Sequence, residues 1–266
     1  MNEHDKVLEA SGVSAERDDD VLQLTLRHPG RRNALTWEMY AQLDDHVREA
    51  ADDHSLRALV LTGTAADGFA AGTDIRQFEE FAGDLDGLRY ERRVGAILAA
   101  IQRLPVPTIA VVQGHAVGAG LALAASCDLV IAERGATFGA PIARTLGNCL
   151  PAAVVGRLMS RLGTSTVLRM LLTAQLLSAE ELAASGFVHR LAEPGEGSAV
   201  AAEVLTGIRR SAPLTLRALK ETVRRIEEAA PVPDNDDLLA LCYGSEDFAG
   251  GVAAFLAKRA PVWNGV

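Results

Sequence analysis

The first clear pattern along the chain is a two-residue alternation of apolar and polar side chains. Leu22, Leu24 and Leu26 occupy every second position, which predicts a half-buried β-strand that ends before the turn at 28–30. Thr36 follows in a position where it can cap a helix. The helical spacing after it predicts one acidic face and one buried face, the latter formed by Tyr40, Leu43 and Val47.

Short apolar runs farther along predict buried strands. The runs at 59–61 and 109–112 are rich in β-branched residues and are followed at once by glycine. The runs at 129–132 and 187–191 repeat the signal. Each strand leads toward a helical segment, and strands that alternate with helices are typical of the α/β class.

The last third of the chain is predicted to be helical. Ser178 and Glu181 form a capping box at the start of one helix. From about residue 199 the pattern becomes purely helical, with Pro213 in the first turn of one helix and Ser245 placed to cap the last. No Pro/Ser-rich linker precedes this part, so we expect it to pack on a neighbouring surface.

These patterns divide the chain into three parts. Residues 1–20 hold few large apolar side chains and end in an acidic run at 16–20, which predicts a mobile leader or an edge strand. Residues 21–198 form the predicted α/β core. Residues 199–266 form the predicted helical region.

Composition limits the function classes. The chain has 266 residues, 48% of them hydrophobic, which is enough for an enzyme-sized core. A formal net charge of −9 argues against nucleic acid as a partner. Cys127, Cys149 and Cys242 form no Cys-x-x-Cys pair, so we expect neither a metal site nor a disulfide framework. No stretch approaches the roughly 18 apolar residues of a membrane span, and the predicted location is cytoplasmic.

Two glycine-containing turns carry the candidate chemistry. In the first, at 69–75, small residues at 70–72 let another group approach the backbone closely. The second, at 114–120, comes straight off the strand at 109–112 and opens a helix. Free N–H groups at such a helix start can bind an anion or a developing oxyanion. Taken alone, each segment also fits an ordinary tight turn.

Nucleotide-binding motifs fit these glycines poorly. Gly118 and Gly120 could begin a dinucleotide fingerprint, but Leu123 stands where glycine or alanine is needed for close helix packing. The glycines at 63 and 68 are followed by Phe69, where a phosphate loop requires lysine. The sequence also lacks a Gly-x-Ser-x-Gly nucleophile elbow.

Five segments in this order resemble the enoyl-CoA hydratase/isomerase (crotonase) family. They are RNAL at 32–35, LVLTG at 59–63, FAAGTDI at 69–75, PTIAVVQG at 107–114 with GAG at 118–120, and CD at 127–128 with FG at 138–139. The tail at 243–263 is similar to the same family's C-terminal region. The resemblance implies a spiral of ββα units, a C-terminal helical region that builds homotrimers or dimers of trimers, and acyl-CoA thioester substrates.

The resemblance also implies an oxyanion hole of two backbone N–H groups, which here belong to Thr73 and Ala119. Such a hole stabilises the enolate that forms when a proton leaves the carbon beside a thioester. Arg31 or Arg32 and Lys258 with Arg259 would meet the CoA phosphates. The remaining residues expected around the substrate are Ala34, Ala71, Gly72, Asp74, Ile75 and Gly118.

The acid/base positions depart from the family pattern. Hydratases of the family carry one glutamate a turn into the helix after the Gly-rich turn and a second after the Phe-Gly-x-Pro motif. The matching residues here are Ala122 and Ile142, which cannot move a proton. General acid/base help is worth about 10² to 10⁴ in rate, so hydration by two glutamates should be crippled.

Other side chains are therefore candidates for proton transfer. Asn148 and Arg144 follow the second lost glutamate in a loop that borders the acyl pocket in this family, and Glu91 lies in the helix after the first turn. Further candidates are Cys149, His115, Glu79 and Glu80, each of which also fits a purely structural or solvated role. Tyr90 and Tyr243 are interpreted as core or interface aromatics.

The sequence thus predicts a crotonase-family enzyme that stabilises a thioester enolate, with enoyl-CoA hydratase/isomerase as its nearest label. It needs no cofactor besides the CoA of the substrate. Alternatives are another crotonase chemistry, such as C–C hydrolysis, decarboxylation, dehalogenation or thioester hydrolysis. A catalytically weak acyl-CoA-binding protein is the alternative from outside the enzymes.

Overall fold

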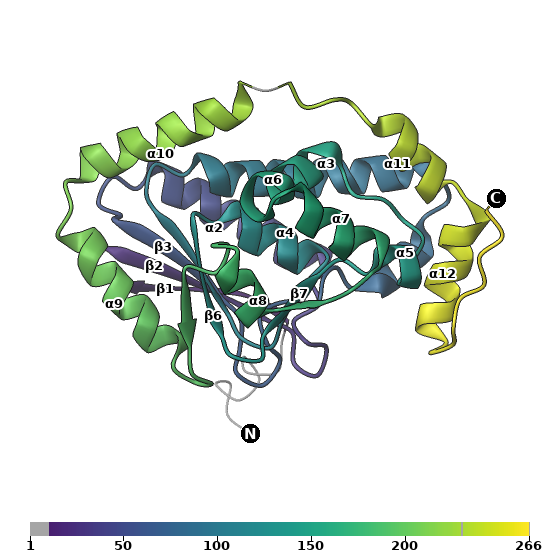
Figure 1. Ribbon diagram of the computed structural model, residues 1–266, viewed down its shortest axis with the longest axis horizontal. Coiled ribbons are helices and arrows are strands. Elements are labelled where there is room, and N and C mark those ends of the chain that lie inside the picture. The colour runs from purple at the N-terminus through teal and green to yellow at the C-terminus, as the bar shows by residue number, and fades with distance from the viewer. Residues whose placement is uncertain (1–10, 230, 266) are drawn as a thin grey trace.

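Two β-sheets form the framework of the protein. The computed structural model describes residues 11–229 and 231–265 (Figure 1). The larger sheet has six strands in the order β1-β2-β3-β4-β6-β9, and all neighbouring pairs are parallel except β1 with β2. Its strands are β1 (Gly12–Asp18), β2 (Val21–Arg27), β3 (Ala58–Thr62), β4 (Thr108–Val112), β6 (Leu129–Glu133) and β9 (Arg190–Ala192).

The smaller sheet continues the same chain segments beyond the ends of the larger one. It consists of β5 (His115–Val117), β7 (Thr137–Gly139) and β8 (Leu177–Ser178), with β5 parallel to β7 and β8 antiparallel to it. β5 follows β4 after two residues and β7 follows β6 after three. Each ββ pair therefore feeds one strand to each sheet before the chain enters a helix.

Helices cover both faces of the larger sheet. One core lies between this sheet and α2 (Trp37–Asp52), α3 (Asp84–Arg103) and α4 (Ala119–Ser126); it contains Leu59 and Leu61 of β3. The alternate residues of the same strand, Ala58 and Val60, lie in a second core on the opposite face, with α9 (Gly197–Arg209). Both faces are buried, which is why β3 and β4 are apolar without alternation.

The remaining helices surround the ends of the framework (Figure 1). They are the 3₁₀-helix η1 (Ile75–Glu80), α5 (Ile142–Thr145), α6 (Ala152–Leu162), α7 (Thr164–Leu172), α8 (Ala179–Ala184), α10 (Pro213–Glu228), α11 (Asp236–Tyr243) and α12 (Glu246–Leu256). A third core, containing Phe78, Leu146, Tyr243 and Phe248, joins η1, α11 and α12 to the loop after α5. Within the described ranges, no helix is long and apolar enough to cross a membrane.

Several local predictions are confirmed. Thr36 caps α2 by accepting from the N–H of Met39, and the predicted apolar face of that helix is buried. The Ser178–Glu181 capping box is present at the start of α8. Ser245 caps α12, and Pro213 occupies the first turn of α10.

Two predictions need correction. Of the two alternatives for the start of the chain, the edge strand is confirmed for residues 12–18, which form β1 and pair with the whole of β2, and the mobile leader is wrong for them. Residues 1–10 of the predicted leader lie outside the described residues. The strand predicted at 187–191 begins only at Arg190, since Phe187 and Val188 pack into the core as a turn after α8.

The predicted division at residue 198 falls within α9. This helix packs on β4, β6 and β9, and its Ala201 and Ile208 belong to the second core of the sheet. Because α9 packs against the sheet, it belongs to the α/β core. The helices that extend away from the sheet begin with α10 (Figure 1).

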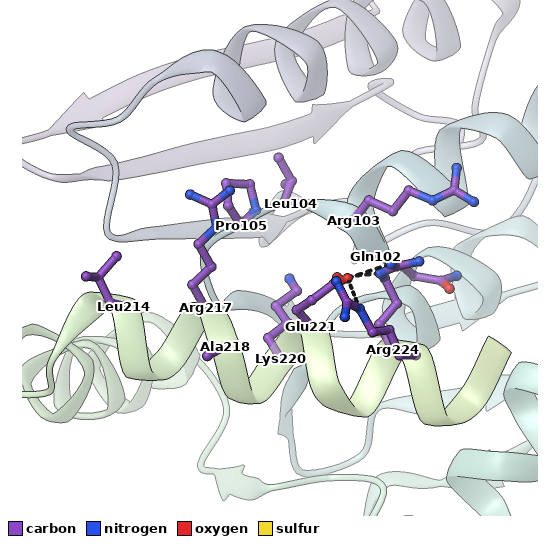
Figure 2. A pocket seen from close by; sticks show the side chains of 11 residues that line it. Gln102, Arg103, Leu104, Pro105, Leu214, Arg217, Ala218, Lys220, Glu221 and Arg224 are labelled. Carbon is purple, nitrogen blue, oxygen red and sulfur yellow. Dashed lines mark hydrogen bonds and ion pairs between the residues drawn. The ribbon is translucent and has the colours of Figure 1, made fainter. Parts of the chain in front are cut away.

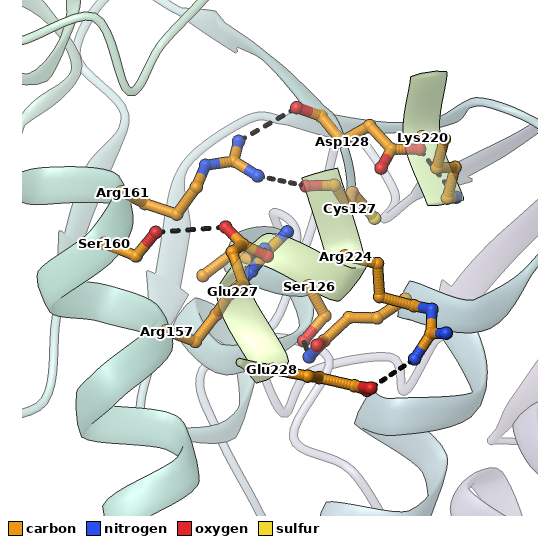
Figure 3. Close-up of polar contacts among 12 residues, drawn as sticks. Ser126, Cys127, Asp128, Arg157, Ser160, Arg161, Lys220, Arg224, Glu227 and Glu228 are labelled. Carbon is orange, nitrogen blue, oxygen red and sulfur yellow. Dashed lines mark hydrogen bonds and ion pairs between the residues drawn. The ribbon is translucent and has the colours of Figure 1, made fainter. Parts of the chain in front are cut away.

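Charged groups attach α10 to the core (Figure 3). The ammonium of Lys220 lies 2.7 Å from the Asp128 carboxylate and donates to the carbonyl of Val106. Asp128 also accepts from the backbone N–H and the hydroxyl of Thr108. At the far end of α10, Glu227 pairs with Arg157 of α6. Because Lys220 is almost completely buried, loss of its partner would leave an uncompensated charge.

We predict that Asp128→Ala lowers the free energy of unfolding by about 3 kcal/mol. The substitution leaves the buried Lys220 ammonium without its ion-pair partner and the N–H and hydroxyl of Thr108 without their acceptor. Glu228→Ala, which removes an exposed partner of Arg224, should cost less than about 1 kcal/mol. Urea denaturation of both variants measures the difference. Equal losses would show that Lys220 is solvated in solution.

Candidate active site

A cavity of about 1140 Å³ opens where the two glycine-containing turns meet. It lies between the smaller sheet, α3, α4 and the C-terminal helix α12. Most residues predicted to surround the substrate line it. They are Arg31, Arg32, Ala34, Ala71, Gly72, Thr73, Asp74, Ile75, Glu91, Gly118, Ala119, Ala122, Ile142, Asn148 and Lys258.

The first turn is held by backbone pairing to β5. The N–H of Ala70 donates to the carbonyl of His115, and the N–H of Val117 donates back to the carbonyl of Ala70. On its other side the buried amide of Asn33 donates to the carbonyl of Gly68 and accepts from the N–H of His28. The asparagine of the RNAL segment therefore joins two loops beneath the mouth of the cavity.

Glycine is required where the two turns touch. Gly72 has a φ of +101°, and a Cβ there would lie 3.2 Å from the carbonyl of Val117 and 3.8 Å from the N atom of Ala119. A Cβ on Gly120 would approach the carbonyl oxygen of Ala70 to 2.2 Å. The absence of side chains thus allows the two backbone segments to lie in direct contact.

This contact brings two unpaired N–H groups to one cavity. Ala119 is the first residue of α4, where no carbonyl of the helix is available to its N–H. Thr73 follows Gly72 in the other turn. Among the described residues, no backbone carbonyl accepts from the N–H of Thr73 or Ala119. Both groups are therefore available to an oxygen atom of a ligand.

Two tyrosine hydroxyls hold the Thr73 side chain in place. Its hydroxyl lies 2.7 Å from the hydroxyl of Tyr40 and 2.7 Å from that of Tyr90. Burial is the main cause that raises the pKa of both tyrosines, so both hydroxyls remain protonated and neutral at physiological pH. The hydroxyl chain anchors the first turn to α2 and α3.

Glu91 of α3 lines the cavity and is 8% exposed. Its Oε1 accepts a hydrogen bond of 2.5 Å from the hydroxyl of Tyr243, which in turn accepts from the Asn148 amide at 3.0 Å. Burial raises the pKa of Glu91 to about 7, although the hydrogen bond from Tyr243 opposes the shift. This carboxyl group is therefore close to half-protonated near neutral pH.

The walls near α4 are apolar. Ala122 is buried one turn into that helix, and Ile142 begins α5 across the cavity. Val94 and Leu98, one and two turns after Glu91 on α3, continue the apolar lining. An uncharged acyl group can be desolvated against this surface, whereas a charge would be destabilised there.

Cations gather at the mouth of the cavity. Arg31 and Arg32 lie exposed on one side, and Lys258 and Arg259 lie exposed on the other, beyond α12. Asp74 is already paired with Arg76, and this pairing lowers its pKa despite burial. The four exposed cations give an otherwise acidic protein a local site for anionic groups.

Some predicted residues lie elsewhere. Arg144 is exposed on α5 and does not line the cavity, so its predicted place in the pocket is wrong for this structure. Glu79 and Glu80 are exposed on η1 and also lie outside the cavity. Cys149 does not line it either, and burial raises the pKa of its thiol, which contacts Cys242.

The sequence analysis did not predict the contact between Tyr243 and Glu91. Tyr243 is a core aromatic, as predicted, but its hydroxyl contacts Glu91 from a position 152 residues later in the chain. The available signal was Gly87, a glycine in the first turn of a helix, four residues before Glu91. A Cβ at Gly87 would lie 2.2 Å from the Tyr243 ring, so the glycine makes room for the tyrosine.

A second cavity, of about 460 Å³, lies between the end of α3 and α10 (Figure 2). Its lining holds one carboxylate, Glu221, which accepts hydrogen bonds from both Arg224 and Arg225. The other charged residues of the lining are Arg103, Arg217 and Lys220. Neither glycine-containing turn reaches this cavity, so it lies apart from the candidate active site. No cluster of three potential metal ligands occurs among the described residues.

Glu91 should also make stability depend on pH. Its pKa of about 7 lies above the ordinary 4.5, so the folded state binds more protons between these values and stability falls as pH rises through them. Glu91→Gln should remove about 3 kcal/mol of this decline. Urea denaturation at pH 5 and pH 8 measures it, with the exposed Glu80→Gln as control. The same decline in Glu91→Gln and wild type would refute the burial of a charge at this site.

Comparison with known proteins agrees with this geometry. The family model for enoyl-CoA hydratase/isomerase matches residues 16–266. The 2,3-dehydroadipyl-CoA hydratase of Escherichia coli (strain K12) is 34% identical over 260 residues, which cover 96% of this chain and 99% of that protein.

Solved structures are similar over the whole fold. A methylmalonyl-CoA decarboxylase in complex with 2-nitronate-propionyl-CoA has a TM-score of 0.85 at 26% identity, covering 96% of this chain and 98% of that one. An enoyl-CoA hydratase/carnithine racemase from Magnetospirillum magneticum has a TM-score of 0.78 at 29% identity, covering 96% of each chain. The protein therefore belongs to the enoyl-CoA hydratase/isomerase (crotonase) family of acyl-CoA enzymes.

Proposed function

We propose that the cavity binds an acyl-CoA thioester with its carbonyl oxygen between the N–H groups of Thr73 and Ala119, where an enolate is stabilised. The observation that carries this proposal is the contact of the two turns through Gly72, which places both unpaired N–H groups in one cavity. Each donor to a developing oxyanion is typically worth about 10² to 10³ in rate. Enolate formation is common to several reactions, of which enoyl-CoA hydration or isomerisation is the nearest label.

The mouth of the cavity supports the CoA part of the proposal. Arg31 and Arg32 would contact the phosphates from one side, and Lys258 from the other. The backbone at Ala71 and Asp74 would face the adenine. No cofactor beyond the CoA of the substrate is required for enolate chemistry, and a cytoplasmic location belongs to the same proposal.

Assembly into a trimer or a dimer of trimers is a further part of the proposal. α10 exposes the large apolar side chains of Leu219, Val223 and Ile226 on one face. Leu238 and Leu241 of α11 are also at least half exposed. Apolar side chains at this spacing on the C-terminal helices suit burial against another copy of the chain.

The experiment that tests the function is a substrate panel followed by product mass. Crotonyl-CoA, a 3-enoyl-CoA and methylmalonyl-CoA are each incubated with the purified protein, and binding is measured in parallel. We expect all three to bind and at least one to turn over. Hydration of crotonyl-CoA at ordinary hydratase rates would contradict the inference that Ala122 and Ile142 remove the two-glutamate route. Failure to bind any of the three would overturn the proposal itself.

Decarboxylation is the second candidate, and it is favoured by the apolar character of both Ala122 and Ile142. Loss of CO₂ from a malonyl-type thioester leaves the bonding electron pair on the α-carbon as an enolate, so no base is needed to form it. Apolar walls disfavour the departing carboxylate and the N–H pair stabilises the product. The structural similarity to a methylmalonyl-CoA decarboxylase supports this candidate.

Placing glutamates at positions 122 and 142 tests how far the pocket differs from that of the hydratases. Because Ala122 and Ile142 both line the cavity, we predict that Ala122→Glu with Ile142→Glu raises crotonyl-CoA hydration by about 10² or more, the usual contribution of general acid/base catalysis. The matched control is Ala143→Glu, on the exposed position next to Ile142. A folded double variant with no gain would mean that the substrate lies differently from that of the hydratases.

A further inference from the structure

Two carboxylates line the cavity, and only one is free to take part in proton transfer. Asp74 is bound to the guanidinium of Arg76 by charge-assisted hydrogen bonds. Glu91 has no cation within ion-pair distance among the described residues, and it accepts a hydrogen bond from the neutral hydroxyl of Tyr243. Glu91 lines the same cavity as Thr73, Ala119 and the apolar Ala122.

The support around Glu91 is built from three distant parts of the chain. Gly87 sits one turn before it on α3 and leaves the space that the Tyr243 ring fills. Tyr243 ends α11, and its hydroxyl donates to Glu91. Asn148, in the loop after α5, donates to the Tyr243 oxygen, which directs the tyrosine proton toward Glu91.

Asn148 also presents an unused polar atom. Its Oδ1 is buried and has no hydrogen-bond partner, although Asn148 lines the cavity. A buried acceptor without a partner is unusual in a folded protein, and this one is available to a donor on a bound ligand. The Glu91–Tyr243–Asn148 group therefore extends from the protein interior to the acyl site.

We infer that Glu91 exchanges a proton with the α-carbon of the bound acyl-CoA, with Tyr243 and Asn148 as positioning residues. This inference rests on the proposed acyl-CoA function. A Glu91 oxygen takes the α-proton, and the C–H electron pair forms the carbon–carbon double bond of the enolate. The π-electrons of the thioester carbonyl move to its oxygen, between Thr73 and Ala119. The reverse step returns the proton, which also quenches an enolate formed by decarboxylation.

The protonation states suit this role. Burial raises the pKa of Glu91 to about 7, so both the acid and the base forms are populated near neutral pH. The titratable groups that face it are Tyr40 on α2, Tyr90 on α3, Tyr243 on α11 and Cys149 in the loop after α5. Burial raises the pKa of each of these four, so all stay neutral while Glu91 titrates.

Deuterium exchange on butyryl-CoA tests the inference, because this probe has an α-proton but no double bond or carboxylate. The wild type in D₂O should incorporate deuterium at the α-carbon, detected by mass. Glu91→Gln should slow exchange by about 10² or more while the Kd for butyryl-CoA changes less than about threefold. Glu80→Gln, an exposed glutamate outside the cavity, is the matched control and should behave as wild type.

Tyr243→Phe tests the role of Tyr243 through the pH dependence of exchange, which would not change if Tyr243 were purely structural. The Tyr243 hydrogen bond lowers the pKa of Glu91, so its removal should shift the midpoint of the exchange rate against pH upward from about 7. Exchange by the base form rises with pH, so the variant should be slower at pH 7 and recover at higher pH.

The outcomes separate this inference from the proposed function. Exchange in Glu91→Gln within threefold of wild type, or an unmoved midpoint in Tyr243→Phe, would overturn the assigned roles. A wild type that binds butyryl-CoA without exchanging its α-protons would overturn the proton-transfer role but leave acyl-CoA binding intact. A wild type that does not bind butyryl-CoA would overturn both.

Discussion

The close contact of two backbone turns is the constraint on which the rest of the site depends. Gly72 and Gly118 face each other, and Gly120 meets the carbonyl of Ala70 at a distance that no side chain would permit. The contact fixes where α4 begins, since β5 leads directly into its first turn. The smaller sheet carries β5 beyond the end of β4, where β5 pairs with Ala70 of the first turn.

Around this contact, the polar groups are arranged by chemical type. Backbone donors come from the two turns, where the protein has no freedom to move them without breaking the sheet pairing. Arg31, Arg32, Lys258 and Arg259 lie exposed at the mouth of the cavity. Glu91 is the one carboxyl group among the described residues of the cavity that has no cation partner, and burial raises its pKa to about 7. This separation suits the proposed binding of a highly charged CoA at the mouth and of an uncharged acyl group against the apolar walls.

The C-terminal helices complete the site as well as extending the fold. α11 brings Tyr243 to Glu91, and residues after α12 bring Lys258 to the mouth of the cavity. The third core, with Phe78, Leu146 and Phe248, holds these helices against η1 and the loop after α5. A displaced C-terminal region would therefore alter both the proposed phosphate contacts of Lys258 and the environment of the Glu91 carboxyl group.

Much of this protein follows from its sequence alone. Local spacing determined β2, β3, β4, the capped helices and the two glycine turns, because these depend on neighbours within a few residues. The ordered motifs identified the family and the positions of Ala122 and Ile142. Only the tertiary structure showed that Glu91 is hydrogen-bonded to Tyr243, that Tyr243 is hydrogen-bonded to Asn148, and that Arg144 lies outside the cavity. These positions depend on how α11 and α5 pack. The chain carries the donors of the site in local turns, whereas the environment of its carboxyl group arises from segments 152 residues apart.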